Sequence, residues 1–396
     1  MMNLPKKLTN KLKLREETNS LRSLKLPSNL VDFSSNDYLG FAKSEVIFDK
    51  THQFLVTNNS KQNGATGSRL LSGNHSLYQT VEKQISEFHQ SETALIFNSG
   101  YDANIGFFSS VPQRGDVILY DEFIHASIRD GIQLSNAKSY KFKHNDLEDL
   151  EKTLISVRAQ SRTLEQEIYI VTESVFSMDG DSPDLEKLSE ISKKNKAFLV
   201  VDEAHAIGVF NDGLIQKLNL QNAVFARIVT FGKALGCHGA AILGSNQLHQ
   251  YLINFARSFI YTTGLSPHAL ATIKCIYDEL VSSIGVENSK KLQENIYHFT
   301  SEINRLNIPV FSFEEMSERQ WGFIESKSAI HCCVISGNEK VKSIAQKLQE
   351  KGFDVKPILS PTVSVHEERL RFCLHAYNST KEITKVLENL SIFKNN

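Results

Sequence analysis

A lysine held between glycines is the feature of this sequence that most strongly suggests covalent chemistry. Lys233 follows the short apolar run from Ile228 to Phe231 and stands between Gly232 and Gly236. At the end of a buried strand a lysine is poorly solvated, which favours its neutral amine, and a neutral amine can form a Schiff base with a carbonyl compound. A surface lysine in a glycine-rich turn is the alternative, and the spacing alone favours neither.

The same stretch excludes a phosphate-binding loop of the nucleotide-hydrolase type. That motif requires Gly-x-x-x-x-Gly-Lys followed by Ser or Thr. Here Arg227 occupies the position of the first glycine, and Ala234 follows the lysine.

A second apolar run, about thirty residues earlier in the chain, ends in a carboxylate. Residues 197–201 lead into Asp202, and His205 follows three residues later. Ligands of open α/β sheets bind at the carboxyl ends of the strands, so Asp202 and Lys233 are expected at the same rim. An aspartate that faces a lysine Schiff base is the arrangement that pyridoxal phosphate uses, because the carboxylate pairs with the pyridinium nitrogen. A helix N-cap is the alternative role for Asp202.

The elements that would position these residues alternate between strand and helix from residue 75 onward. The expected strands are continuously apolar, which is typical of a mostly parallel sheet with helices on both faces. The last of them follows its predecessor so closely that it can pair antiparallel. The expected strands are 93–97, 116–120, 138–142, 168–172, 197–202, 227–231 and 239–243.

The remainder of the chain is organised differently. Residues 4–26 place leucines among basic side chains and predict an amphipathic helical arm, which a turn-rich segment follows at 31–40. Helices are expected near 246–257 and 266–283, the second as a long connector. Residues 290–396 mix helices with short strands and predict a smaller α+β domain.

Several other strand ends carry groups that could hold a phosphorylated ring. Gly100 and Tyr101 open a helix, where free backbone N–H groups can bind a phosphate, and Thr230 can bond the same group. His125 could lie flat over a pyridine ring, and Ser177 could reach a ring substituent. A plain turn, or a histidine bonded to the start of a helix, is the alternative for each position taken alone.

Composition and charge limit the classes of partner. The 396 residues carry 44 Lys and Arg against 45 Asp and Glu, so nothing favours nucleic acid or an anionic membrane, and a small molecule is expected instead. The five cysteines form no Cys-x-x-Cys pair, which argues against a zinc site or disulfides and indicates reduced thiols in a cytoplasmic protein. No apolar run approaches the roughly 18 residues of a spanning helix, and the N-terminus has no secretory apolar region.

Motifs that occur in a fixed order along the chain carry a resemblance to a known family. The chain resembles the α-oxoamine synthases, which are fold-type-I pyridoxal-phosphate enzymes, from about Arg15 to its C-terminus. The resemblance implies a homodimer with a helical arm (1–35), a large cofactor-binding domain with a mostly parallel seven-stranded sheet (36–275) and a small α+β domain (276–396). The motifs include Phe33-Ser-Ser-Asn-Asp-Tyr-Leu-Gly40, Ser99-Gly-Tyr101, His125-Ala-Ser127, His144-Asn-Asp146, Asp202-Glu-Ala-His205 and Thr230-Phe-Gly-Lys233.

The resemblance also implies a role for each candidate site residue. Lys233 would bind pyridoxal 5′-phosphate covalently and act in catalysis with Asp202, His125 and His205. Ser177 and His205 are expected to contact the ring oxygen of the cofactor. The residues expected to hold its phosphate are Gly100, Tyr101, Thr230 and, from a second subunit, Thr262 or Thr263. The expected substrate contacts are Arg22, Asn36, Thr362 and Arg371.

The implied reaction is the decarboxylative condensation of an amino acid with an acyl thioester. Within the family, the chain looks most like the members that join L-alanine to a pimeloyl thioester, whether carried by coenzyme A or by an acyl carrier protein. Members that use another amino acid or thioester stay open as alternatives. Departures from the family pattern lie at Ala206-Ile207, at 210–214 and at Tyr78, and they concern the acyl substrate more than the cofactor.

Overall fold

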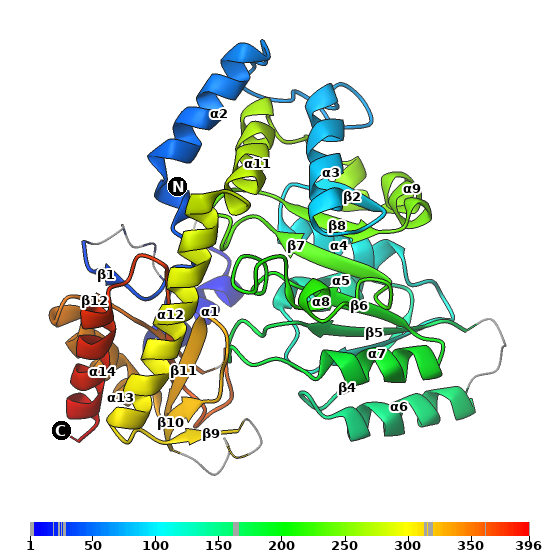
Figure 1. Cartoon of the computed structure of the whole chain (residues 1–396). Helices are drawn as coiled ribbons and strands as arrows, with labels where there is room; N and C mark the ends of the chain where they lie inside the picture. The colour runs from blue at the N-terminus through cyan, green and yellow to red at the C-terminus, as the bar shows by residue number, and fades with distance from the viewer. Residues whose placement is uncertain are drawn as a thin grey trace.

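The computed structural model has a seven-stranded sheet, a five-stranded sheet and a two-stranded sheet with their helices, and an N-terminal arm (Figure 1). It describes residues 4–18, 20–22, 24, 26, 29–160, 166–312, 315, 320–360 and 362–395. Pro361 directly precedes the expected substrate residue Thr362 and lies outside the described residues.

The larger sheet has seven strands in the order β2-β8-β7-β6-β5-β3-β4, and only β8 runs antiparallel to its neighbours. This confirms the predicted mostly parallel sheet and the antiparallel return of its last strand. The strands are β2 (Thr93–Phe97), β3 (Val117–Asp121), β4 (Lys138–Phe142), β5 (Ile168–Glu173), β6 (Phe198–Asp202), β7 (Ala226–Thr230) and β8 (Ala240–Gly244).

Alternate residues of the inner strands pack against helices on opposite faces, which explains why these strands are mostly apolar. The edge strand β4 is the exception, because four of its five residues are exposed. Ile118 and Val200 join a core with α4, α5 and α9, whereas Leu119 and Val201 join another core with α6 and α7. The helices of this domain are α2 (Glu45–Thr57), α3 (Ser76–Phe88), α4 (Gly100–Ser110), α5 (Ala126–Leu134), α6 (Leu147–Gln160), α7 (Leu185–Lys194), α8 (Leu214–Lys217), α9 (Asn246–Phe255), α10 (Arg257–Ile260) and α11 (Pro267–Leu280).

The smaller sheet has five strands in the order β13-β14-β11-β10-β9. Its predicted α+β character is confirmed, but the sequence pattern missed β10. The long connector was predicted at 266–283, whereas in the structure it is the next helix along the chain. That helix is α12 (Ser283–Arg305), which runs along the junction of the two domains (Figure 1). The other elements are β9 (Val310–Phe311), β10 (Trp321–Ile324), β11 (Ile330–Ile335), α13 (Asn338–Glu350), β12 (Phe353–Asp354), β13 (Lys356–Ile358), β14 (Arg369–Cys373) and α14 (Thr380–Asn395).

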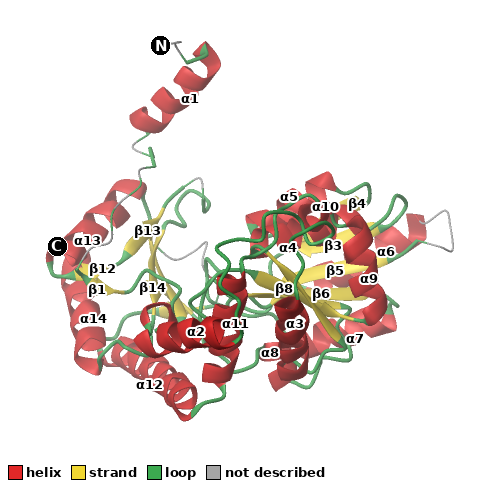
Figure 2. Ribbon diagram, turned by 90° about the horizontal axis from the view of Figure 1, so that it is seen from above, coloured by secondary structure: helices red, strands yellow, loops and turns green. Residues whose placement is uncertain are grey.

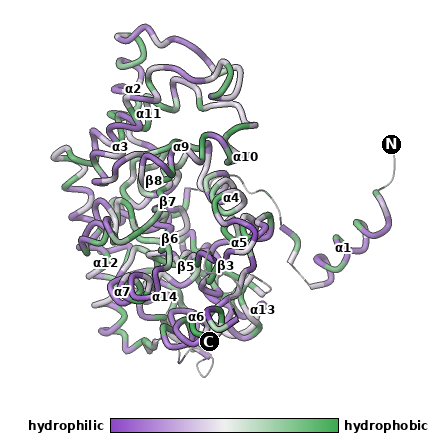
Figure 3. The backbone as a smooth tube through the Cα atoms, turned by 90° about the vertical axis from the view of Figure 1, so that its right-hand side faces the viewer, coloured by the Kyte–Doolittle hydropathy of each residue, from purple (hydrophilic) through white to green (hydrophobic). Residues whose placement is uncertain are grey.

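The N-terminal arm begins with α1 (Lys6–Glu17), which projects from the body and buries none of its residues in this chain (Figures 2 and 3). The chain then enters the body through β1 (Val31–Asp32), which pairs in parallel with β12, and through the short helix η1 (Phe41–Lys43). The segment after β1 therefore runs from the small domain to the large one. In the part of the chain that the structure describes, no helix is long and apolar enough to cross a membrane.

Candidate active site

Lys233 lies in a tight turn directly after β7. The turn is closed by hydrogen bonds from the N–H of Phe231 to the carbonyl of Gly239 (2.9 Å) and from the N–H of Gly236 to the carbonyl of Lys233 (2.8 Å). Gly236 has a φ of 64°, and a Cβ built there would lie 2.3 Å from the backbone nitrogen of Ala42, so only glycine fits. The glycine thus lets two backbones meet and fixes the base of the lysine side chain.

The lysine amine is poorly solvated, as the sequence predicts. Burial lowers the pKa of Lys233 to about 8, the carboxylates of Asp202 and Glu173 oppose that shift, and the guanidinium of Arg371 adds to it. A substantial fraction of the amine is therefore neutral near physiological pH and can act as a nucleophile or a base.

His205 is the direct partner of the lysine. Its Nε2 is hydrogen-bonded to Lys233 Nζ, and its Nδ1 lies 2.8 Å from the hydroxyl of Tyr38. Burial, together with the positive charges of Lys233 and Arg371, holds the pKa of His205 well below its ordinary value. The imidazole is therefore neutral.

Asp202, the last residue of β6, is held by two donors. Its Oδ2 accepts a hydrogen bond from Asn104 Nδ2 (2.9 Å), and its Oδ1 accepts one from the N–H of Ala204 (2.9 Å). A run of turns follows Asp202 instead of a helix, so the alternative role as a helix N-cap does not apply. The carboxylate lies near enough to Lys233 to raise the pKa of that amine.

His125 precedes α5 and takes the helix-start role weighed for it, whereas its stacking on the cofactor ring stays a prediction. Its Nδ1 accepts from the N–H of Ser127 (3.2 Å), so it caps the helix, while its own N–H donates to Glu173 Oε1 (2.5 Å). The side chain is nevertheless exposed, which leaves its ring able to stack on a planar ligand.

The start of α4 offers an anion site. Ser99 caps the helix by accepting from the N–H of Asp102 (3.0 Å), and the N–H groups of Gly100 and Tyr101 in the first turn have no intrahelical acceptor. A Cβ at Gly100 would lie 3.5 Å from Thr230 Oγ1, which places that hydroxyl beside the helix start. The three predicted phosphate contacts thus come together.

Thr262 and Thr263 lie beside the same helix start within this chain. Asn98 Nδ2 donates to Thr262 Oγ1 (3.1 Å) and to the carbonyl of Thr263 (2.7 Å). Their predicted contact with the cofactor of a second subunit stays a prediction.

Arg371 joins the site from β14 of the small domain. It is mostly buried, its Nε donates to the carbonyl of Ser177 (2.8 Å), and one Nη donates to Asn36 Oδ1 (3.0 Å). Arg371 therefore contacts Asn36, another predicted substrate residue, and Ser177, a predicted ring contact. Arg22 and Thr362 are exposed, and their predicted substrate contacts stay predictions.

Three residues of this cluster were not predicted as site residues. Glu173 lies opposite Asp202 in the register of β5 and β6, so its place at the end of an apolar run was a usable signal. Asn104 stands one helical turn after Gly100 and hence on the same face of α4. Tyr38 had no such signal, because 167 residues separate it from His205.

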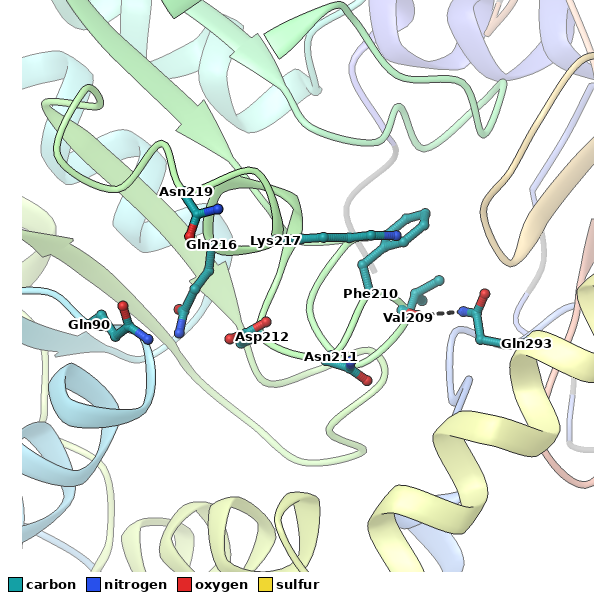
Figure 4. Close-up of a pocket in the computed structure, with 9 residues that line it drawn as sticks. All are labelled: Gln90, Val209, Phe210, Asn211, Asp212, Gln216, Lys217, Asn219 and Gln293. Carbon is teal, nitrogen blue, oxygen red and sulfur yellow. Dashed lines mark hydrogen bonds between the residues drawn. The ribbon is translucent and has the colours of Figure 1, made fainter. Parts of the chain in front are cut away.

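A separate cavity of about 400 Å³ lies near the loop that departs from the family pattern (Figure 4). Gln293 of α12 donates to the carbonyl of Val209 (2.6 Å) at one side of it. None of the residues that line this cavity belongs to the lysine cluster, so it is distinct from the site of Lys233.

The clustered residues fit pyridoxal 5′-phosphate. A lysine that is partly neutral can bind its aldehyde, a fixed carboxylate can pair with its ring nitrogen, and an exposed imidazole can cover its ring. The phosphate can be held by the free N–H groups at the start of α4 and by Thr230.

Comparisons with known proteins agree with this fit. The model of the aminotransferase class I and II family matches residues 28–390. An 8-amino-7-oxononanoate synthase of Emericella nidulans is 39% identical over 394 residues, which cover 96% of this chain and 93% of that protein.

Two solved structures share the fold over nearly the whole chain. Serine palmitoyltransferase of Sphingomonas wittichii has a TM-score of 0.82 at 25% identity, covering 100% of this chain and 98% of its own. The 8-amino-7-oxononanoate synthase of Francisella tularensis has a TM-score of 0.74 at 27% identity, covering 92% and 98%. The chain therefore belongs to the aminotransferase class I and II family and, within it, to the α-oxoamine synthases, which are pyridoxal-phosphate-dependent acyltransferases.

Proposed function

We propose that this protein condenses L-alanine with a pimeloyl thioester and forms 8-amino-7-oxononanoate, carbon dioxide and the free thiol carrier, a step of biotin biosynthesis. The identity of 39% with a synthase of that name, over 96% of the chain, supports the choice of substrates. The single structural observation that carries the amino-acid half of the proposal is the hydrogen-bonded link of Arg371 to Lys233 through Asn36, Tyr38 and His205.

Arg371 supplies the positive charge that an amino-acid carboxylate needs. Its guanidinium donates to Ser177, Cys373 and Asn36, and Tyr38 is a further hydrogen-bond partner. The group stays protonated. A charge-assisted hydrogen bond from it to an α-carboxylate would be roughly twice as strong as a neutral one.

Lys233 would then remove the α-proton of the bound amino acid. With a pKa of about 8, the amine is basic enough to accept the proton and neutral often enough to be ready for it. When bound, pyridoxal phosphate supplies an electron sink for the pair that this proton leaves behind. Asp202 would keep a proton on the ring nitrogen, and that fixed charge favours the transition state.

The acyl half of the proposal rests on the arm. The far carboxylate of a pimeloyl group needs a basic or strongly hydrogen-bonding partner, because burying it alone is costly. Arg22 is the candidate, since it is exposed and belongs to the arm between α1 and β1. Closure of the arm over the site would also exclude water from the reaction.

A second candidate function is the condensation of serine with a long-chain acyl thioester. The likeness to the serine palmitoyltransferase of Sphingomonas wittichii favours it, because its TM-score of 0.82 exceeds the 0.74 of the Francisella tularensis synthase.

Product analysis separates the two candidates. Purified protein loaded with pyridoxal phosphate would be incubated with alanine, glycine or serine, each paired with pimeloyl, acetyl or palmitoyl coenzyme A. Mass spectrometry would identify the product. We expect 8-amino-7-oxononanoate to form fastest; a preference for serine with palmitoyl coenzyme A would replace the proposal with the second candidate, and product from glycine would point to another member of the family.

A further inference from the structure

A chain of hydrogen bonds runs from Arg371 to the catalytic lysine through three intermediate residues. Arg371 donates to Asn36 Oδ1 (3.0 Å), and Tyr38 also donates to that oxygen (3.1 Å). The Tyr38 oxygen lies 2.8 Å from His205 Nδ1, and His205 Nε2 is bonded to Lys233 Nζ. Tyr38 and His205 are buried, so water does not compete for these bonds.

The charge of Arg371 sets the direction of the first two bonds. Arginine remains protonated in proteins and only donates, so the Asn36 atom that faces it must be the amide oxygen and not the nitrogen. The Tyr38 hydroxyl faces this same oxygen and must therefore donate its proton to it.

The direction of the third bond follows from proton counting. Tyr38 has one proton, which Asn36 accepts, so the phenol oxygen can only accept from His205 Nδ1. Burial raises the pKa of Tyr38, which keeps the phenol protonated. His205 must therefore carry a proton on Nδ1.

The other nitrogen of His205 then carries no proton. Burial lowers the pKa of His205, and the nearby Lys233 and Arg371 lower it further. With a single proton on Nδ1, the imidazole presents the lone pair of Nε2 to the amine of Lys233.

We infer that Arg371, Asn36 and Tyr38 fix His205 as its Nδ1–H tautomer, which makes Tyr38 a positioning residue for the proton transfer at Lys233. Because Nε2 accepts an N–H of the amine, the lone pair of the neutral amine points away from His205 and is free to take a proton. The opposite tautomer would donate to that lone pair and block it. This consequence for catalysis rests on the proposed function, whereas the tautomer itself does not.

This series of hydrogen bonds also crosses the boundary between the domains. Arg371 is on β14 of the small domain, Asn36 and Tyr38 are in the segment after β1, and His205 and Lys233 are in the large domain. The tautomer of His205 is therefore defined only while the two domains are in contact.

The test is the protonation state of His205 in the cofactor-free protein. Protein labelled with ¹⁵N at histidine would be measured by long-range ¹H–¹⁵N NMR at neutral pH, and the His205 signals would be assigned by their loss in His205→Gln. We expect a protonated Nδ1 and an unprotonated Nε2. An Nε2–H tautomer, or a doubly protonated ring, in the wild-type protein would overturn the inference without any variant having to fold.

A tyrosine variant adds a functional readout. In Tyr38→Phe the acceptor of the Nδ1 proton is gone, so we expect the His205 signals to shift toward the Nε2–H tautomer and the rate of alanine α-proton exchange to fall about tenfold. Tyr277→Phe is the matched control, because its hydroxyl bonds the buried His89 Nε2 at 2.9 Å in another part of the core. Unchanged His205 signals in Tyr38→Phe would contradict the positioning role. Because the NMR measurement needs no substrate, its result is independent of whether the proposed reaction is correct.

Discussion

The lysine at the centre of the site depends on a balance of nearby charges. Burial and Arg371 lower the pKa of Lys233, while Asp202 and Glu173 raise it, and the outcome is about 8. A lysine with its ordinary pKa of 10.5 would be almost entirely charged near neutral pH and a poor base. Burial, only partly opposed by the two carboxylates, thus makes this side chain suitable for both covalent attachment and proton transfer.

Replacing this lysine tests the covalent attachment. Lys233→Ala should no longer hold pyridoxal phosphate after borohydride reduction, because no other amine lies at the strand end, whereas Lys217→Ala should behave like the parent. Mass spectrometry of the reduced protein measures the attached mass. Attachment that persists in Lys233→Ala would show that another lysine binds the cofactor.

Replacing Asp202 separates binding of the cofactor from turnover. Asp202→Asn fills the same space beside Asn104 but cannot hold a proton on the ring nitrogen by charge, so the cofactor should stay bound while turnover falls well over tenfold. Steady-state kinetics at saturating cofactor measure the loss. A variant within about tenfold of the parent would limit the barrier change to ~1.4 kcal/mol, which is too little for the proposed role.

At the scale of elements, the loop after β5 is held by groups from both domains. Asp179 pairs with the buried Arg369 of β14, and the carbonyl of Gly180 accepts from the hydroxyls of Ser326 (2.7 Å) and Ser328 (2.8 Å). From the large domain, His144 lies 2.8 Å from Asp181. This loop carries Ser177, whose carbonyl accepts from Arg371, so its anchoring fixes one wall of the site.

His144 bridges two carboxylates and should stabilise the fold in its charged form. Burial lowers its pKa, but hydrogen bonds to Asp121 and Asp181 outweigh burial and raise the pKa from 6.5 to about 10. Because the folded-state pKa is the higher one, this stabilisation is complete below pH 6.5 and is lost as the pH rises toward 10.

The prediction is a pH-dependent difference between wild type and His144→Gln. The variant should unfold more easily at pH 6, with a loss on the order of 3–5 kcal/mol for a broken buried ion pair, and the difference should shrink steadily up to pH 10. Denaturant unfolding across this range measures it, with the exposed His52→Gln as control. A difference that grows with pH would show that His144 is neutral in the folded protein.

The sequence predicted the elements of the large sheet well because most of the strands are short, mainly apolar runs separated by helical segments. It predicted β10 poorly, because this strand has only four residues and contains Gly322 at a φ of 138°. The predicted cofactor contacts at Gly100, Thr230 and Asp202 lie at or just after strand ends, so they could be inferred locally. The bond between Tyr38 and His205 could not, because it depends on how the segment after β1 crosses between the domains.

For the whole molecule, an exposed apolar surface beside the cofactor site supports the homodimer that the family resemblance implies. We define this surface by Leu70, Leu71 and Tyr261, whose segments are joined by a hydrogen bond from the N–H of Gly264 to the carbonyl of Gly67 (3.0 Å). Leu71 is 86% exposed and Tyr261 72% exposed in the single chain. Apolar side chains gathered this way are typical of a protein interface.

Leu71→Glu should therefore weaken the dimer and lower the activity, since a partner's Thr262 or Thr263 is expected to complete the phosphate site. Ile155→Glu, on the exposed face of α6, should change neither the mass nor the rate. Light scattering combined with activity assays measures both. A wild-type protein that is fully active as a monomer would contradict the predicted role of the dimer.

Lys233 is proposed to remove the α-proton of the amino acid, and exchange of the α-proton of L-alanine is the direct test of that role. Protein loaded with pyridoxal phosphate would be incubated with L-alanine in D2O, without thioester, and deuterium at the α-carbon would be followed by ¹H NMR. The wild-type protein should exchange the proton, and Lys233→Ala loaded with the same cofactor should lose at least about a hundredfold in rate, the lower range for a general base. Exchange by Lys233→Ala at the wild-type rate, or none by the wild-type protein, would contradict the account.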